Sequence, residues 1–313
     1  MARGRLANTP SDFTALGWRD ILWRVWAALD RDNVSIIAAG VAFYGMLAIF
    51  PAITSFVSIY GLLANPADVH AQFAALKGVI PGEARTLLNQ QLQAVASSSE
   101  KKLGIGAAVG LIIALWSSGA GIRALMTALN IAYREEEKHS FVRFYGMAMM
   151  FTFGIVVIGF FSLGVIVVVP VVLNLIKLGA LSAALVKVTP WLVLAVMITI
   201  ALGALYRYGA SRRSPKTRWV SVGAVVATVL WLASSILFSF YVANFASYNH
   251  TYGSLGAVVI LLMWFWISAY IVLLGAELNA EMEHQTRVDT TEGRPKPMGQ
   301  RGAFVADHVG EVP

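Results

Sequence analysis

Arg123 is the residue whose chemistry stands out first, because it lies within an otherwise apolar stretch of the sequence. A cation at the centre of a membrane-spanning helix costs roughly 2.5–3.5 kcal/mol on insertion scales, so its side chain must meet protein, water or a headgroup. On a helix, it shares one side with residues three or four positions apart: Gly119, Thr127, Asn130 and Arg134. The spacing predicts a polar stripe that faces the interior of a bundle. The alternative is an arginine that snorkels to the interface or ties helix ends together.

Glu277 is the acidic residue best placed to pair with Arg123. It shares a helix face with Tyr270, Glu281 and His284 near the end of the last apolar segment. We expect an ion pair between Glu277 and Arg123. A carboxylate that carries protons is the alternative, because ionisable residues inside membrane helices often belong to proton relays.

The residue types used for acid–base, nucleophilic or metal chemistry form no motif. The chain has 5 His and 0 Cys, and the histidines lack HExxH spacing, a second metal ligand nearby or a GxSxG elbow. Gly104, Gly106 and Gly110 resemble a dinucleotide fingerprint only in part, because the last spacing is wrong. We therefore predict no catalytic residues, no metal, no cofactor and no enzymatic activity.

The composition indicates which elements must hold these polar residues. Of 313 residues, 58% are hydrophobic and 13% are charged, against about 25% charged in soluble domains. The formal net charge of +7 comes from too few charged residues to suggest a nucleic-acid surface, so no nucleic-acid partner is expected. A membrane protein with basic loops explains both numbers, and lipids are its expected surroundings.

Five stretches without a charged residue approach or exceed the length of a membrane span. About 20 apolar residues cross a bilayer core, so the last stretch must hold two helices, divided at the polar cluster 244–253. The stretches are Val34 to Ala64, Leu103 to Ile122, Phe144 to Ile176, Val188 to Tyr206 and Trp219 to Ala276. The predicted fold class is an all-α polytopic membrane protein with six transmembrane helices, which form a domain over 34–283. A soluble helical core is the alternative, but its helices would each show a charged face.

The distribution of Lys and Arg predicts the orientation. Five lie in residues 1–33, three in 131–143, five in 207–218 and four after residue 283, whereas the loops on the opposite side hold six. Because basic residues favour the cytoplasmic side, we expect both termini in the cytoplasm of a bacterial inner-membrane protein.

Three segments outside the predicted spans have patterns of their own. Residues 1–33 read as an amphipathic helix with Trp on one face and Arg on the other, which would lie on the cytoplasmic leaflet or pack on the bundle. The loop 65–102 contains two short amphipathic patterns, expected as extracytoplasmic helices. The tail 284–313 mixes Gly, Pro and charges without a periodic apolar face, so we expect it to be disordered.

Three separated blocks, in order, resemble the YihY/BrkB membrane family. They are SIIAAGVAFYGMLAIFP at 35–51, LWSSG at 115–119 followed by ALNIAY at 128–133, and YGSLGA at 252–257 followed by LLGAELNA at 273–280. The resemblance implies a six-helix inner-membrane protein. Members of that family have carried the label ribonuclease BN, have been linked to serum resistance as virulence factors, or have been tied to envelope lipid or solute transport.

The leading functional hypothesis is a transporter or lipid-handling translocator that serves the envelope. The residues predicted to line or gate its pathway are Tyr44, Pro51, Trp116, Ser118, Gly121, Arg123, Asn130, Tyr252, Gly253, Glu277 and Asn279. One alternative is an envelope scaffold that docks a protein partner through loop 65–102. Another is the ribonuclease of the old family label, which is disfavoured because RNA cleavage needs positioned acid–base groups or metal ligands. The substrate and the oligomeric state stay open.

Overall fold

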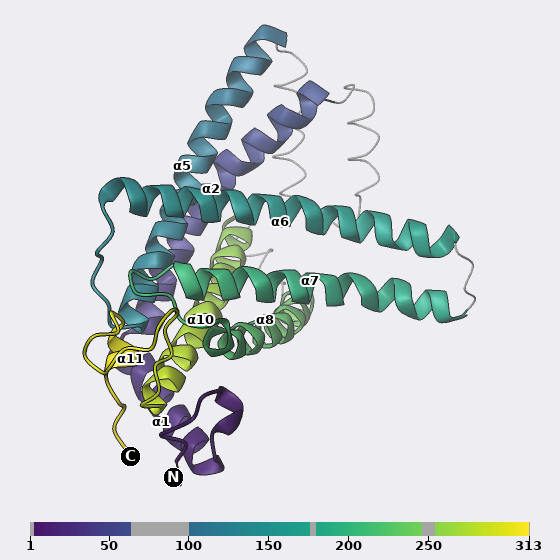
Figure 1. The fold of residues 1–313 in the computed structure, drawn as a ribbon. Coiled ribbons are helices and arrows are strands. Elements are labelled where there is room, and N and C mark those ends of the chain that lie inside the picture. Colours follow the sequence, from purple (N-terminus) through teal and green to yellow (C-terminus); the bar gives the residue numbers. More distant parts are fainter. Residues whose placement is uncertain (1–2, 64–99, 176–179, 246–253, 313) are drawn as a thin grey trace.

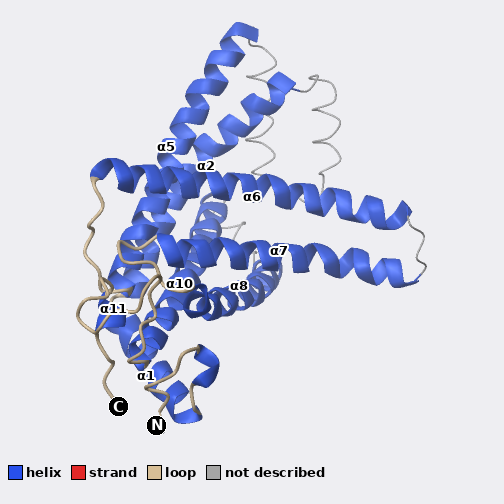
Figure 2. Ribbon diagram, viewed as in Figure 1, coloured by secondary structure: helices blue, strands red, loops and turns tan. Residues whose placement is uncertain are grey.

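A computed structural model describes residues 3–63, 100–175, 180–245 and 254–312, and this part of the chain consists of helices and loops (Figure 2). It contains six helices of 29 to 35 residues: α2 (Val34–Leu63), α5 (Glu100–Ala132), α6 (Phe141–Leu175), α7 (Ala180–Tyr208), α8 (Thr217–Phe245) and α10 (Ser254–Gln285). The shorter elements are η1 (Pro10–Asp12), α1 (Ala15–Arg31) and α11 (Phe304–Asp307). The predicted all-α class is therefore confirmed for the described residues.

Several of these helices can cross a membrane. Within the described residues, four stretches are long and apolar enough to do so: Phe141–Gly159, Thr189–Tyr208, Thr217–Val242 and Val258–Gln285. In α2, the apolar stretch that meets the same test of composition is shorter, Val34–Ala48. A polytopic membrane protein is thus confirmed, whereas the count of six spans stays a prediction. The predicted helices within loop 65–102 lie outside the described residues, apart from 100–102 at the start of α5.

The long helices gather at one end of the molecule and diverge from it (Figure 1). Helices α2 and α5 run side by side, α6 and α7 form a second pair that crosses them, and α10 contacts α1, α2, α5 and α8. The gathered end also holds α1, the connections 133–140 and 209–216, and the tail 286–312; we call it the polar end. Both termini lie there, as an even number of spans requires.

The main hydrophobic core lies next to the polar end and joins five of the long helices. Its fully buried members include Ala38 of α2, Leu129 of α5, Tyr206 of α7, Ala224 of α8 and Leu273 of α10. The many alanines and glycines at these contacts let helix backbones approach closely, which is how helices associate where lipid removes the hydrophobic drive.

The tail is ordered, so the prediction of disorder at 284–313 is wrong for residues 284–312. Its backbone and side chains bind the N-terminal segment: Gln285 donates to the carbonyl oxygen of Arg3 at 2.7 Å, and Thr286 donates to that of Ala7 at 2.8 Å. Arg301 is 5% exposed and donates to the carbonyl oxygens of Ala306 and Arg287. Charged residues such as Arg301, whose scatter suggested disorder, form hydrogen bonds to backbone groups in the folded tail. Such contacts leave no helical periodicity in the sequence.

We expect acid to loosen this tail, because of Asp289. Burial favours its neutral form, but the N–H of Lys296 and the hydroxyl and N–H of Thr291 all donate to its carboxylate, and together they hold the pKa of Asp289 below its ordinary value. A lowered pKa stabilises the fold above the unfolded value of about 3.9, and this contribution is lost as pH falls through the folded value. Hydrogen exchange in peptides covering 289–301, corrected for intrinsic rates, should speed up below about pH 4.

The variant Asp289→Asn should show the same loosening at neutral pH. The matched control is Asp30→Asn, at an exposed position of α1, which should leave exchange in 289–301 unchanged. Equal protection in wild type and Asp289→Asn would contradict the assignment.

Helix α1 packs against α10 with a face that includes charged residues. Asp20 and Arg24 are 0% and 6% exposed, whereas Leu22, Trp23 and Trp26 are 53–77% exposed. In the sequence, Arg24 falls on the face opposite the Trp residues, yet the structure buries it together with Asp20, because Arg24 binds Glu281 of α10 and Asp20 binds Arg3. The exposed Trp face agrees with the predicted position on a leaflet, which stays a prediction.

Candidate membrane-embedded binding site

The predicted polar stripe on α5 does not act as one surface. Arg123 is only partly buried, and its guanidinium lies over the ring of Tyr145 on α6, 4.5 Å from the ring centre, and near Trp116 at 5.6 Å. Thr127 is exposed and donates to the carbonyl oxygen of Arg123. Two aromatic faces thus contact the partly buried cation, an interaction worth about 0.5–2 kcal/mol. The other residues of the stripe contact different parts of the protein: Asn130 bonds to Ser211 and Glu137, and Arg134 lies near Glu281.

The predicted ion pair between Arg123 and Glu277 is wrong. Glu277 is 1% exposed, and neither of its carboxylate oxygens has a hydrogen-bond partner among the described residues. The charged groups that act on it are Arg31, Asp32, Arg134 and Glu281, all at the polar end. Arg123 faces α6 instead, so the two residues belong to different helix interfaces.

Asn279 and Asn130 are structural clamps. The amide oxygen of Asn279 accepts from the N–H of Gly223 at 2.9 Å, and its nitrogen donates to the carbonyl oxygen of Val220, which joins α10 to α8. Asn130 accepts from the N–H of Ser211 at 2.7 Å and donates to Glu137 at 2.9 Å, which joins the two polar-end connections. Buried amides that bond through both the oxygen and the nitrogen fix the positions of the helices.

The other predicted site residues are scattered. Tyr44 and Trp116 are 42% and 58% exposed, and Gly121 contacts the backbone of Gly45 across α2 and α5. The side chains of Pro51 and Ser118 lie outside the described part of the chain, as do Tyr252 and Gly253 entirely. Of the eleven predicted residues, Gly121 is the one that the structure places on the wall of the cavity described next.

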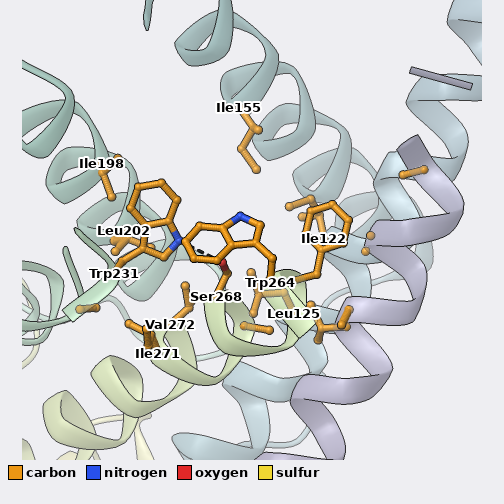
Figure 3. A pocket seen from close by; sticks show the side chains of 18 of the residues that line it. Ile122, Leu125, Ile155, Ile198, Leu202, Trp231, Trp264, Ser268, Ile271 and Val272 are labelled. Carbon is orange, nitrogen blue, oxygen red and sulfur yellow. Dashed lines mark hydrogen bonds between the residues drawn. The ribbon is translucent and has the colours of Figure 1, made fainter. Parts of the chain in front are cut away.

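A cavity of about 530 Å³ lies among α2, α5, α6, α7, α8 and α10 (Figure 3). Its wall is almost entirely hydrocarbon and aromatic, and the labelled residues are Ile122, Leu125, Ile155, Ile198, Leu202, Trp231, Trp264, Ser268, Ile271 and Val272. Its volume is within the range of about 300–1,000 Å³ that small-molecule sites occupy. Charge and motif spacing could not reveal this cavity, because its residues look like ordinary lipid-facing or core residues.

Most of the few polar groups on this wall are already satisfied, and the indole N–H of Trp264, which has no hydrogen bond to the residues drawn in Figure 3, is the exception. The indole N–H of Trp231 donates to the hydroxyl of Ser268 at 3.0 Å, and the hydroxyl of Thr152 donates to the carbonyl oxygen of Ala148 at 2.8 Å. The indole of Trp231 also packs against that of Trp264, with ring centres 5.5 Å apart. The cavity therefore offers a ligand apolar contact and no free charge.

A second cluster, at the polar end, consists of buried ion pairs that the sequence reading missed. Arg24 Nε lies 2.6 Å from Glu281 Oε2, and its Nη2 donates to Gln285 Oε1 at 2.9 Å. Arg212 Nη2 lies 2.9 Å from Glu283 Oε1, with both side chains 0% exposed. A signal was present, since Glu281 and Gln285 lie four residues apart on α10, but their partner Arg24 comes from α1, and the partner of Glu283 comes from the 209–216 connection.

The described residues contain no group of three or more His, Asp or Glu side chains that could hold a metal ion.

Comparison with known proteins identifies the family. A family model described as Virulence factor BrkB matches residues 25–300 of the chain. The chain belongs to this family. In this BrkB-family protein the match includes α1 from Val25 and the tail as far as residue 300.

Individual relatives of this BrkB-family chain are distant but cover most of it. It is 28% identical over 261 residues to a putative ribonuclease-like protein, YfkH, of Bacillus subtilis, covering 80% of this chain and 90% of that protein. It is also 28% identical over 261 residues to a UPF0761 membrane protein of Vibrio parahaemolyticus, covering 82% and 80% of the two chains. A UPF0761 membrane protein of Idiomarina loihiensis is 25% identical over 258 residues, covering 81% and 87%. No solved structure matches the chain.

Proposed function

We propose that this BrkB-family membrane protein is a lipid-handling translocator whose cavity holds hydrocarbon. The observation that carries the proposal is the cavity wall, which is apolar over nearly its whole surface and whose Trp231, Ser268 and Thr152 groups already bond to protein. An ion or a sugar entering it would lose hydrogen bonds to water without replacement, at a cost of several kcal/mol. An acyl chain loses none and keeps contact with apolar surface throughout.

Translocation of a polar solute is less well supported. Such a pathway would need polar groups on its wall, and Arg123, Asn130, Glu277 and Asn279 are not among the cavity's lining residues. The scaffold hypothesis concerns loop 65–102, which lies almost entirely outside the described residues. The ribonuclease hypothesis rests on the printed name of YfkH and on the older family label.

We propose the inner membrane as the location, with both termini in the cytoplasm. The support is the excess of Lys and Arg in the segments that meet at the polar end, together with the contact between the two termini, in which Arg5 donates to the carbonyl oxygen of Gly310 at 2.8 Å.

Filling the cavity should weaken lipid binding. In Ile198→Trp, the indole would occupy space that the cavity leaves beside Trp231, so we expect the amount of phospholipid retained through purification, measured by native mass spectrometry, to fall about tenfold, equivalent to about 1.4 kcal/mol. Transfer of a fluorescent phospholipid between the leaflets of proteoliposomes should fall with it.

The matched control is Ile200→Trp, two residues along the same helix at a position 67% exposed and outside the cavity wall. It adds the same bulk and should keep both properties. Unchanged lipid retention and transfer in Ile198→Trp would remove the cavity from the proposed function.

A further inference from the structure

Glu277 is a buried carboxyl without a cation of its own. Its neighbours Glu281 and Glu283 on α10 are equally buried, and each lies within 2.6–2.9 Å of an arginine nitrogen. The oxygens of Glu277 have no hydrogen-bond partner in the described residues. An ionised carboxylate in such a place costs several kcal/mol, whereas a neutral acid costs far less.

The charged groups around Glu277 are already matched with one another. Arg31 at the end of α1 binds Asp32 at 2.7 Å, and Arg134 after α5 lies 3.6 Å from Glu281. Tyr133 contributes an uncharged phenol, and α2 contributes no charged residue along Val34–Leu63. Arg24 of α1 also binds Glu281, at 2.6 Å, so each of these three cations is bound to a carboxylate other than Glu277.

Glu277 lies between the two cavities. One helical turn from it, about 6 Å along α10, Glu281 lines a cavity of about 370 Å³ at the polar end, together with Arg31, Arg134, His284 and His308. In the other direction, Leu273 and Ala276, 1% and 0% exposed, separate it from Ala269 on the wall of the apolar cavity.

His284 supplies a second feature of a proton path. It is 2% exposed, neither ring nitrogen has a hydrogen-bond partner among the described residues, and its Nδ1 lies 3.5 Å from Glu281 Oε2. His284, Glu281 and Glu277 follow one face of α10 inward from the polar cavity. Chains of carboxylates and histidines within membrane helices are typical of proton relays.

We propose that Glu277 is a proton-binding site, supplied from the polar cavity past His284, and that this proton is the coupling ion of translocation; the second part rests on the proposed function. In the binding step, a hydronium ion in the cavity transfers its proton to a Glu277 carboxylate oxygen, which leaves water and a neutral carboxylic acid. Release reverses the step. Ionised Glu277 would need Arg31 or Arg134 to leave its present partner, which would disturb the contacts that close the apolar cavity toward this end.

The first test measures the proton directly on the full-length protein in phospholipid nanodiscs. Dicyclohexylcarbodiimide reacts with protonated carboxyls in apolar surroundings, so peptide mapping at a pH of about 7 should find the adduct on Glu277, while the ion-paired Glu281 and Glu283 act as internal controls. Infrared spectra should show an acid carbonyl band that disappears in Glu277→Gln. An unlabelled Glu277 with no acid band in wild type would overturn the inference, and the labelling depends neither on transport nor on any variant.

The second test measures coupling. Transfer of a fluorescent phospholipid in proteoliposomes should change about fivefold or more when a proton gradient is imposed, and Glu277→Gln should respond to no gradient. Transfer that ignores the gradient in wild type would overturn the coupling. A labelled Glu277 in a protein that moves no lipid under any gradient would support the proton site while removing the proposed function.

Discussion

Replacing Arg212 with alanine is expected to lower the free energy of unfolding by about 3–5 kcal/mol, the range found when one partner of a buried ion pair is removed. Its guanidinium lies 3.7 Å from the centre of the Tyr133 ring and 2.9 Å from Glu283. Burial disfavours the charge, but the charge and hydrogen bond of Glu283, together with Tyr133 and Glu135, raise the pKa of Arg212 above its ordinary value. Without Arg212, the one hydrogen bond that the described residues would still give the Glu283 carboxylate is that from the hydroxyl of Thr290, at 2.7 Å.

Thermal unfolding followed by tryptophan fluorescence measures this loss. The control Lys138→Ala removes a salt bridge of 2.6 Å to Glu135, but Lys138 is 60% exposed, so stability should change by less than about 1 kcal/mol. The double variant Arg212→Met, Glu283→Met removes both charges and should recover much of the stability. If Arg212→Ala unfolds at the wild-type temperature, the pair does not hold the polar end together.

A methyl group at Gly223 is expected to separate α8 from α10. A Cβ there would overlap the carbonyl oxygen of Gly275 and the amide of Asn279, and a Cβ on Gly275 would overlap the hydroxyl of Tyr206 and lie 2.9 Å from the Cβ of Ala227. Backbone atoms cannot swing aside as a flexible side chain does. Gly223→Ala should therefore destabilise the protein by about 3 kcal/mol, the upper end of the range for overpacking.

At a position with open space, replacing glycine by alanine should raise the stability of the protein or leave it unchanged. Gly203 lies within α7, and a Cβ there would meet nothing within 4 Å. Since alanine is favoured over glycine in a helix interior by about 1 kcal/mol, Gly203→Ala should be neutral or stabilising. Purified yield and unfolding temperature compare the two variants, and equal stability of Gly223→Ala and wild type would mean that the helices do not cross so closely.

These effects all concern the polar end, which the structure presents as a tightly bonded platform. The apolar cavity lies on its far side, with the core of Ala38, Leu129 and Leu273 between them. Glu277 is buried beside this core, and its carboxyl oxygens have no hydrogen-bond partner among the described residues. A stable platform with one unsatisfied carboxyl at its boundary is an arrangement in which a proton can alter helix contacts without unfolding the protein.

The sequence by itself determined that this is a helical membrane protein, and roughly where its helices lie. Long runs without charge have one stable solution in a bilayer, a helix that satisfies its own backbone, so Phe144 to Ile176 and Trp219 to Ala276 could be read directly. The pairing of both termini at one end also agrees with the predicted even number of spans. The family blocks were equally visible in the residues.

Only the tertiary structure decided which polar residues meet. Arg123 contacts Tyr145 and not Glu277, and Arg24 is buried against Glu281. Helical periodicity shows which residues share a face of a helix, but it does not show which other helix that face contacts. The tail folded because its charges bind backbone groups within the tail, as Arg301 does with the carbonyl oxygens of Ala306 and Arg287, and because distant residues bind it, as Arg5 does at the carbonyl oxygen of Gly310. The cavity lies where the apolar helices diverge. From sequence alone, an apolar side chain on the wall of a cavity cannot be distinguished from one in the core or one that faces lipid.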